Sequence, residues 1–172
     1  FLFLGRVVES KGVRFLVDLW KDPALQRVEL VIAGDGPLAA ELRAQSAPNV
    51  RWVGHVEGEV KERLKAGCRA ILFPSIWPEP LSTVAYEAYE MNKPIVASHV
   101  GGMAEIIAEG QTGFLLPPGR KPDWRQRILQ LAQDPELSQR LGETGRKWLE
   151  REVSPARWLE QFNAIAWKAL SD

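Results

Sequence analysis

Short apolar runs alternate with longer segments of helical periodicity over residues 1–119, and glycine or proline stands at most of the boundaries. Several runs are hydrophobic at consecutive positions, which is typical of strands buried on both faces. The predicted strands are Phe1–Leu4, Val28–Ala33, Val50–Val53, Ala70–Phe73, Ile95–Ala97 and Gly113–Leu116. The predicted helices between them are Val13–Trp20, Leu38–Ala47, Val60–Ala66, Ser82–Met91 and Met103–Ala108. This alternation predicts a parallel sheet covered by helices.

After Gly119 the strand-like runs stop and three amphipathic segments follow. These predicted helices are Trp124–Ala132, Glu136–Glu152 and Pro155–Leu170. We therefore predict an α/β fold: a doubly wound, mostly parallel, six-stranded Rossmann-like sheet in residues 1–119, followed by a helical tail in residues 120–172. With the common strand order 3-2-1-4-5-6, a crevice opens between the loops after the first and fourth strands. The site should therefore lie in the segments from Gly5 to Gly12 and from Ser75 to Ser82.

Composition and charge exclude several other classes of protein. A chain of 172 residues is expected to form a single domain, and its 22 basic and 22 acidic residues argue against a nucleic-acid-binding domain. The single Cys68 cannot form an internal disulfide, and no Cys/His cluster has the spacing of a zinc site. No apolar run is long enough to span a bilayer and no leader precedes Phe1, so a cytoplasmic protein is expected. Because Phe1 already lies in a predicted strand, the chain is expected to be a piece of a longer polypeptide.

The first loop carries two cations between two glycines, Gly5-Arg6 and Lys11-Gly12. Arg offers a planar fork of donors that matches phosphate oxygens, and Lys offers a compact mobile charge. An isolated pair with this spacing is usually a solvated turn, but its place after the first strand favours phosphate binding.

The second loop contains Glu79, and the helix after it contains Glu87, eight positions later. With Ser82 or Thr83 as its cap, the helix start offers unpaired N–H groups and the positive end of the helix dipole to an anion. A carboxylate is repelled by a diphosphate, but it can accept hydrogen bonds from the hydroxyls of a ribose or a sugar. A site in which cations bind phosphates and carboxylates bind hydroxyls is predicted to be a nucleotide-sugar pocket. In the alternative interpretation, Glu79 is a surface residue and Glu87, in the middle of its helix, is a salt-bridge partner.

Five motifs in order carry a resemblance to a known family. They are Gly5-Arg6-x4-Lys11-Gly12, Gly34-Asp35-Gly36-Pro37, Pro74-Ser75, Glu79-x7-Glu87-Ala88, and Gly101-Gly102-x2-Glu105-Ile106-Ile107 followed by Gly110-x2-Gly113. With these motifs the chain resembles the C-terminal, donor-binding domain of a retaining glycosyltransferase of family 4, with the GT-B fold.

The resemblance implies a role for each matching residue. Arg6 and Lys11 would bind the donor diphosphate and stabilise its charge as it leaves, and Glu87 would bind the ribose hydroxyls. Glu79 would lie beside the transferred sugar, near the anomeric carbon. The remaining expected donor-binding residues, whose backbone faces the ligand, are Gly5, Leu81, Ser82 and Thr83. The family often has Gly-Phe-Gly where this chain has Pro80-Leu81-Ser82, which changes the backbone donors available to the phosphates.

The same resemblance implies sugar transfer from a UDP-, GDP- or ADP-sugar with retention of configuration, without a metal or other cofactor. The acceptor, a glycan or a lipid-linked sugar, would be held by an N-terminal domain that this chain lacks. The isolated domain is therefore expected to bind donor and to turn over little. Products of this kind belong to polysaccharide biosynthesis.

Alternative functions remain open at this point. Another GT-B enzyme, such as a nucleotide-sugar epimerase or a phosphorylase, would share the fold, and a non-catalytic module could keep the binding site alone. The run Gly34-x-Gly36-x-x-Ala39 partly matches a dinucleotide fingerprint, but it follows the second strand and not the first, which disfavours a dehydrogenase.

Three further features give expectations about surfaces. His55, at a strand end, could approach a base, although loop histidines near a site are more often bystanders. A basic cluster suggests peripheral contact with an anionic membrane, or else a solvated helix face; its members are Arg120, Lys121, Arg125 and Arg127. In the last helix, a stripe with Trp158, Phe162 and Ile165, and Trp167 nearby, should mostly pack against the sheet, with a part left exposed for a missing partner.

Overall fold

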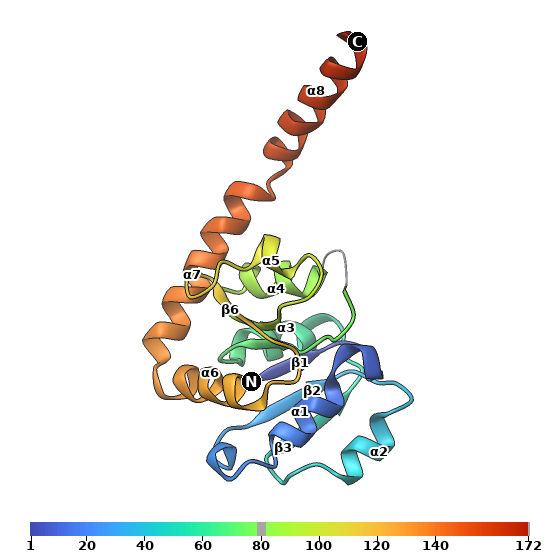
Figure 1. Cartoon of the computed structure of the whole chain (residues 1–172), viewed down its shortest axis with the longest axis vertical. Helices are drawn as coiled ribbons and strands as arrows, with labels where there is room; N and C mark the ends of the chain where they lie inside the picture. The colour runs from blue at the N-terminus through green and yellow to red at the C-terminus, as the bar shows by residue number, and fades with distance from the viewer. Residues whose placement is uncertain (79–81, 172) are drawn as a thin grey trace.

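The computed structural model describes residues 1–78 and 82–171, apart from a few side chains of the last helix. Six strands form one sheet in which every pair is parallel. The strands are β1 (Leu2–Leu4), β2 (Leu30–Ala33), β3 (Val50–Gly54), β4 (Ile71–Phe73), β5 (Ile95–Ser98) and β6 (Gly113–Leu116). Their spatial order is β3-β2-β1-β4-β5-β6, which confirms the predicted order and fold class (Figure 1).

Eight α-helices lie in the described part of the chain, and each corresponds to a predicted segment. They are α1 (Val13–Leu19), α2 (Ala39–Ala44), α3 (Gly58–Gly67), α4 (Thr83–Glu90), α5 (Met103–Ile106), α6 (Lys121–Gln133), α7 (Pro135–Glu152) and α8 (Pro155–Ser171). Two 3-10 turns, η1 (Glu9–Lys11) and η2 (Pro23–Leu25), precede and follow α1. α2 and α5 are shorter than predicted, and Ala47 and Ile107 pack against the two cores from beyond the helix ends.

The two faces of the sheet build two separate cores, because successive strand residues point to opposite sides. In β2, Leu30 and Ile32 join the cluster that includes α1 and α6, whereas Val31 and Ala33 join the cluster that includes α4 and α5. Helices therefore cover both faces, as the apolar strands require. Each fully buried aliphatic or aromatic side chain contributes about 1.5–3 kcal/mol relative to an exposed one.

The first two helices of the tail pack on the domain, α6 against the core with α1 and α7 against α4. α7 crosses α4 so closely that a Cβ on Gly142 would lie 1.9 Å from the Asn92 carbonyl oxygen, and one on Gly145 would lie 2.3 Å from the Tyr89 ring. Trp148 of α7 stacks at a 6° interplanar angle on Tyr86 of α4. Glycine on α7 thus allows the two helices to touch.

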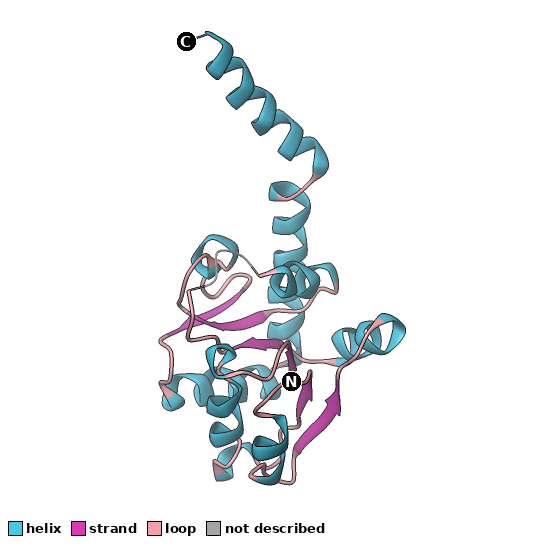
Figure 2. Ribbon diagram, turned by 90° about the vertical axis from the view of Figure 1, so that its right-hand side faces the viewer, coloured by secondary structure: helices cyan, strands magenta, loops and turns pink. Residues whose placement is uncertain are grey.

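α8 leaves the body of the molecule and projects beyond α7 (Figures 1 and 2). Its described aromatic side chains are exposed, with Trp158 at 63% and Trp167 at 71%, and Phe162 is exposed as well. The expectation that this stripe mostly packs against the sheet is wrong, because α8 extends past the edge of the domain. The expectation that part of the stripe is exposed is confirmed for these three residues, and the Ile165 side chain lies outside the described ones.

Candidate functional site

The two loops predicted to form the site lie against each other. Since β1 and β4 are neighbours and parallel, both loops leave the same edge of the sheet. The Ser10 carbonyl oxygen accepts hydrogen bonds from Ser75 Oγ at 2.9 Å and from the Ile76 amide at 3.0 Å. Gly12 lies at φ +70°, and a Cβ there would lie 1.9 Å from the Pro74 carbonyl oxygen. The position next to Lys11 therefore requires glycine both for its backbone conformation and for its contact with the other loop.

A cavity of about 300 Å³ lies where these loops meet the start of α4. It is lined by Phe3, Leu4, Gly5, Arg6, Lys11, Phe73, Ser82, Thr83 and Val84. Lys11 Nζ lies 5.6 Å from the centre of the Phe73 ring, a distance at which the ring face attracts the cation. Ser82 is the N-cap residue of α4, but within the described residues its side chain makes no capping hydrogen bond. Two cations and an uncapped helix start thus converge on one cavity, an arrangement suited to a phosphate group.

A second cavity, of about 330 Å³, adjoins the first. It is lined by Leu4, Gly5, Arg6, Ala33, Gly34, Asp35, His55, Val56, Lys61, Thr83, Val84 and Glu87. Five of these residues, from β1, its loop and α4, also line the first cavity, so the two cavities are halves of one site. The second half combines apolar side chains with the carboxylates of Glu87 and Asp35 and the ammonium group of Lys61.

Glu87 is held by two lysines of α3. Its Oε2 atom lies 2.7 Å from Lys61 Nζ and 3.2 Å from Lys65 Nζ. Partial burial by itself would raise the pKa of Glu87, but the hydrogen bonds from Lys61 and Lys65 outweigh this effect, and the pKa lies below its usual value. Glu87 is therefore a salt-bridge partner, as the alternative interpretation held, and it also lines the cavity.

Sequence reasoning did not find Lys61 and Lys65. They stand four positions apart on α3, a spacing that places two side chains on one helix face. Nothing in that spacing says which acidic residue of another helix they meet, because the contact depends on how α3 and α4 pack. A helix with this many charged residues is equally compatible with a solvated face.

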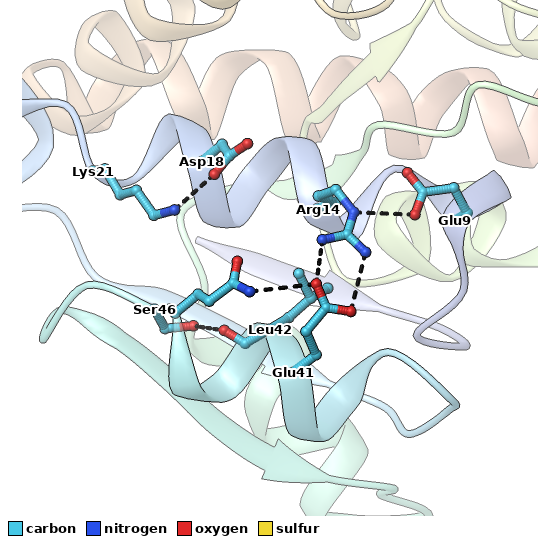
Figure 3. Close-up of polar contacts among 8 residues, drawn as sticks. Glu9, Arg14, Asp18, Lys21, Glu41, Leu42 and Ser46 are labelled. Atoms are coloured by element: carbon cyan, nitrogen blue, oxygen red, sulfur yellow. Dashed lines mark hydrogen bonds and ion pairs between the residues drawn. The ribbon is translucent and has the colours of Figure 1, made fainter.

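A network of exposed ion pairs occupies the outer side of the β1–α1 loop (Figure 3). Arg14 Nε lies 3.2 Å from Glu9 Oε2, and the same guanidinium makes two contacts with Glu41 of α2, at 2.6 and 3.3 Å. Hydrogen bonds to Glu41 and then Glu9 raise the pKa of Arg14 above its already high value. Because solvent screens exposed pairs such as these, each contributes little to stability. Glu9 stands between Arg6 and Lys11 in the sequence. Its carboxylate pairs with Arg14 on this network.

The predicted site residues that the structure describes are divided between the two cavities. Arg6, Lys11, Gly5, Ser82 and Thr83 all line the first cavity, whereas Glu87 lines only the second. Glu79 and Leu81, the other two, lie outside the described residues.

His55 is exposed at the rim of the second cavity. Its Nε2 atom lies 3.0 Å from Glu57 Oε1. The side chain therefore has a neighbouring carboxylate, which is consistent with either of the roles weighed for it.

A larger cavity than these two lies elsewhere. A space of about 850 Å³ surrounds Phe1 and Cys68 at the amino ends of the strands. The predicted site residues that the structure describes are all absent from its lining. In doubly wound sheets, ligands bind outside the carboxyl ends of the strands, so size does not identify the site here.

The structure adds two observations on metals and membranes. Among the described residues there is no group of three His, Cys, Asp or Glu side chains that could hold a metal ion. No described helix is both long enough and apolar enough to cross a membrane. In the basic cluster, Arg120, Arg125 and Arg127 each pair with a carboxylate, so the charges expected to reach a membrane surface are partly neutralised.

Fold and site together define a doubly wound α/β domain with a two-part ligand cavity at the carboxyl ends of its strands. The sequence matches the family model of glycosyl transferases group 1 over residues 1–148. The D-rhamnosyltransferase WbpZ of Pseudomonas aeruginosa is 35% identical over 150 residues, which cover 83% of this chain and 38% of that protein. The chain therefore belongs to the family of glycosyl transferases group 1.

Solved structures share the fold. HepE from Anabaena in complex with UDP superposes with a TM-score of 0.79 at 23% identity, covering 99% of this chain and 48% of that one. The C-terminal domain of LpcC, a group 1 family protein from Francisella tularensis, gives a TM-score of 0.77 at 17% identity over 90% of this chain and 85% of that domain. The resemblance to a C-terminal domain of a GT-B glycosyltransferase is thereby confirmed, while family 4 membership and retention of configuration stay predictions. The chain spans less than half the length of WbpZ and HepE.

Proposed function

We propose that this domain binds the nucleoside-diphosphate-sugar donor of a glycosyltransferase. The observation that carries the proposal is the joined cavity. One half has two cations and a helix start, and the other adds the Glu87 and Asp35 carboxylates and several apolar side chains. The groups of such a donor follow one another in a matching order, with the base and the ribose at one end and the two phosphates next to them.

The half with Arg6 and Lys11 takes the diphosphate. A charge-assisted hydrogen bond of this type contributes about 1.5–3 kcal/mol, and the first turn of α4 adds N–H groups and its dipole. Thr83 and Ser82 sit at that helix start. The same groups stabilise the negative charge that develops on the leaving diphosphate, since they are already oriented before the bond breaks.

The half with Glu87 takes the nucleoside. Its carboxylate accepts hydrogen bonds from ribose hydroxyls, and the apolar walls contact the base. HepE has been solved in complex with UDP and also with UDP-glucose, which supports a uridine diphosphate donor for a protein of this fold. GDP and ADP sugars are the other candidates for this chain.

Chemistry at the sugar follows from the family resemblance. We assign Glu79 to the side of the anomeric carbon and the backbone of Leu81 to the phosphates. In this assignment the sugar leaves the diphosphate with retention of configuration and without a metal, because Arg6 and Lys11 supply the positive charge.

A second domain completes the enzyme in this proposal. The relatives are more than twice as long as this chain. An N-terminal domain would hold the acceptor, a glycan or a lipid-linked sugar, and the exposed face of α8 would dock on it. The domain alone would then bind donor without efficient turnover.

The test compares binding and turnover in the full-length protein carrying Arg6→Ala or Lys11→Ala. A transferase loses turnover far more than ground-state affinity, because these cations act most strongly on the leaving group. A loss of affinity in a protein that transfers no sugar would assign the site to a binding module, and equal losses in affinity and turnover would contradict the action of these cations on the leaving group. Lys21→Ala, which removes an ion-paired lysine outside the cavity, serves as the control.

A further inference from the structure

Lys65 is a buried cation that the proposed donor contacts do not use. Its side chain is only 3% exposed, although it belongs to the amphipathic surface helix α3. Burying an ammonium group is unfavourable unless partners replace its water. Its partners are Glu62 Oε1 at 2.7 Å and Glu87 Oε2 at 3.2 Å. Burial alone would lower the pKa of Lys65, but these two acids more than compensate and raise it, so the group stays charged.

The contacts on Glu87 are one-sided. Oε2 is the carboxylate oxygen nearest to both Lys61 Nζ and Lys65 Nζ, and among the described residues no side-chain hydrogen bond ends on Oε1. The Glu87 side chain is 24% exposed and lines the nucleoside half of the cavity. One oxygen of this carboxylate is thus fixed by the protein while the other stays available to a ligand.

The two lysines differ in what else they can do. Lys61 itself lines the cavity and is 27% exposed, so it can also touch a ligand. Lys65 does not line the cavity, and its described partners are Glu62 and Glu87. Any effect of Lys65 on a ligand must therefore pass through the Glu87 carboxylate.

We propose that Lys65 is a positioning residue that anchors Oε2 of Glu87 and so directs Oε1 to the two ribose hydroxyls of the donor. This inference rests on the proposed function, since it needs a nucleoside in the second half of the cavity. It adds to that function a residue that sets the preference for ribose over a sugar without these hydroxyls.

The test measures hydroxyl discrimination, not affinity alone. UDP and 2′,3′-dideoxy-UDP are titrated into the protein, together with the corresponding guanosine and adenosine pairs, and the ratio of dissociation constants is compared between variants. Lys65→Met keeps the length and removes the charge. We expect it to reduce the ratio roughly tenfold while leaving the affinity for the dideoxy compound unchanged. A lysine with only a structural role would weaken both compounds alike, which would overturn the inference.

Glu87→Gln and the double variant complete a double-mutant cycle with Lys65→Met. Glu87→Gln should abolish most of the discrimination, and adding Lys65→Met to it should change nothing more, because the two residues act through one contact. Lys21→Met, which removes another ion-paired lysine, is the matched control and should leave the ratio at its starting value. Independent effects of Lys65→Met and Glu87→Gln would contradict the positioning role.

Failure of this inference can be separated from failure of the proposed function. If the unmodified protein binds none of the diphosphates, the proposed function fails. If it binds one of them and Glu87→Gln removes the discrimination while Lys65→Met does not, only the positioning role of Lys65 fails. Should Lys65→Met not fold, Lys65→Gln, which also removes the charge, takes its place in the same titrations, and an unchanged ratio of dissociation constants would overturn the inference.

Discussion

We propose for Glu87 a ligand-binding role beside the salt bridges that sequence reasoning had treated as the alternative. It is a salt-bridge partner of Lys61 and Lys65, and its carboxylate also lines the cavity. The two roles are compatible because both ammonium groups use the same oxygen. A carboxylate that is ionised and fixed in advance loses little freedom when a hydroxyl donor binds, which favours recognition.

The ionisation of Glu87 makes a prediction about pH and stability. Its pKa is lower in the folded protein than the 4.5 expected for the unfolded chain, so the stabilisation is fully present above 4.5 and is lost as pH falls through the folded pKa. We expect the free energy of unfolding of the wild type, minus that of Glu87→Gln, to stay constant from pH 7 to about 4.5 and to decrease below it. Urea unfolding at a series of pH values measures this difference.

The control for this experiment is Glu41→Gln, on the surface of α2. The guanidinium of Arg14, through hydrogen bonds, likewise holds the pKa of Glu41 below its usual value, but the pair lies outside the cavity. Both acids should show the same sign of pH dependence, whereas only Glu87→Gln should also alter nucleotide binding. A Glu87 difference that grows as pH falls below 4.5 would show that the lysines do not stabilise the charged form.

The loops that carry the site depend on a contact between elements. Gly12 lies between η1 and α1 and touches the Pro74 carbonyl that follows β4. This contact and the hydrogen bond from Ser75 to Ser10 bring Lys11 close to the start of α4. The position of the Lys11 ammonium group thus depends on how the backbones of the two loops pack against each other.

Gly12→Ala should therefore damage both stability and binding. The left-handed backbone costs about 1–2 kcal/mol for alanine, and the added Cβ would also push the two loops apart. We expect a loss of at least about 2 kcal/mol in the free energy of unfolding, together with a weaker affinity for nucleoside diphosphates, roughly tenfold, measured by calorimetry.

Gly119→Ala is the matched control for this substitution. Gly119 has nearly the same conformation, φ +73°, but a Cβ there would meet nothing within 4 Å. It should lose only the backbone contribution and keep its nucleotide affinity. Equal effects of Gly12→Ala and Gly119→Ala would mean that the contact between the loops is unimportant.

The elements themselves were largely predictable. Buried parallel strands leave uninterrupted apolar runs, and glycine and proline mark the ends of the segments, so the strands, their order and the cavity-lining residues Arg6 and Lys11 followed from the sequence. The ion pairs from α3 to Glu87 did not, because they depend on how two helices pack. The position of α8 did not follow either: an amphipathic pattern shows that a helix has an apolar face, but not what covers it.

At the level of the whole molecule, the chain consists of a body, residues 1–154, and one helix, α8, that projects from it (Figure 2). Its exposed large apolar side chains are Trp158, Leu159, Phe162 and Trp167. Trp158 and Phe162 stack on each other with ring centres 5.2 Å apart. Apolar patches of this kind usually mark a surface that contacts another domain or protein.

Removal of residues 155–172 should leave the body intact. Since these exposed side chains lie outside the buried core clusters, we expect the unfolding temperature of the body to change by less than about 2 °C and nucleotide affinity to stay the same. Differential scanning fluorimetry and calorimetry on the truncated chain measure both. A truncated chain that fails to fold would show that α8 packs on the body in solution.

The most direct measurement is a calorimetric titration of the folded domain with UDP, GDP and ADP. We predict that at least one of them binds at a single site, and that Arg6→Ala and Lys11→Ala each weaken that binding about 10- to 100-fold. Absence of binding by all three to a domain that is folded by circular dichroism would contradict the donor-site assignment.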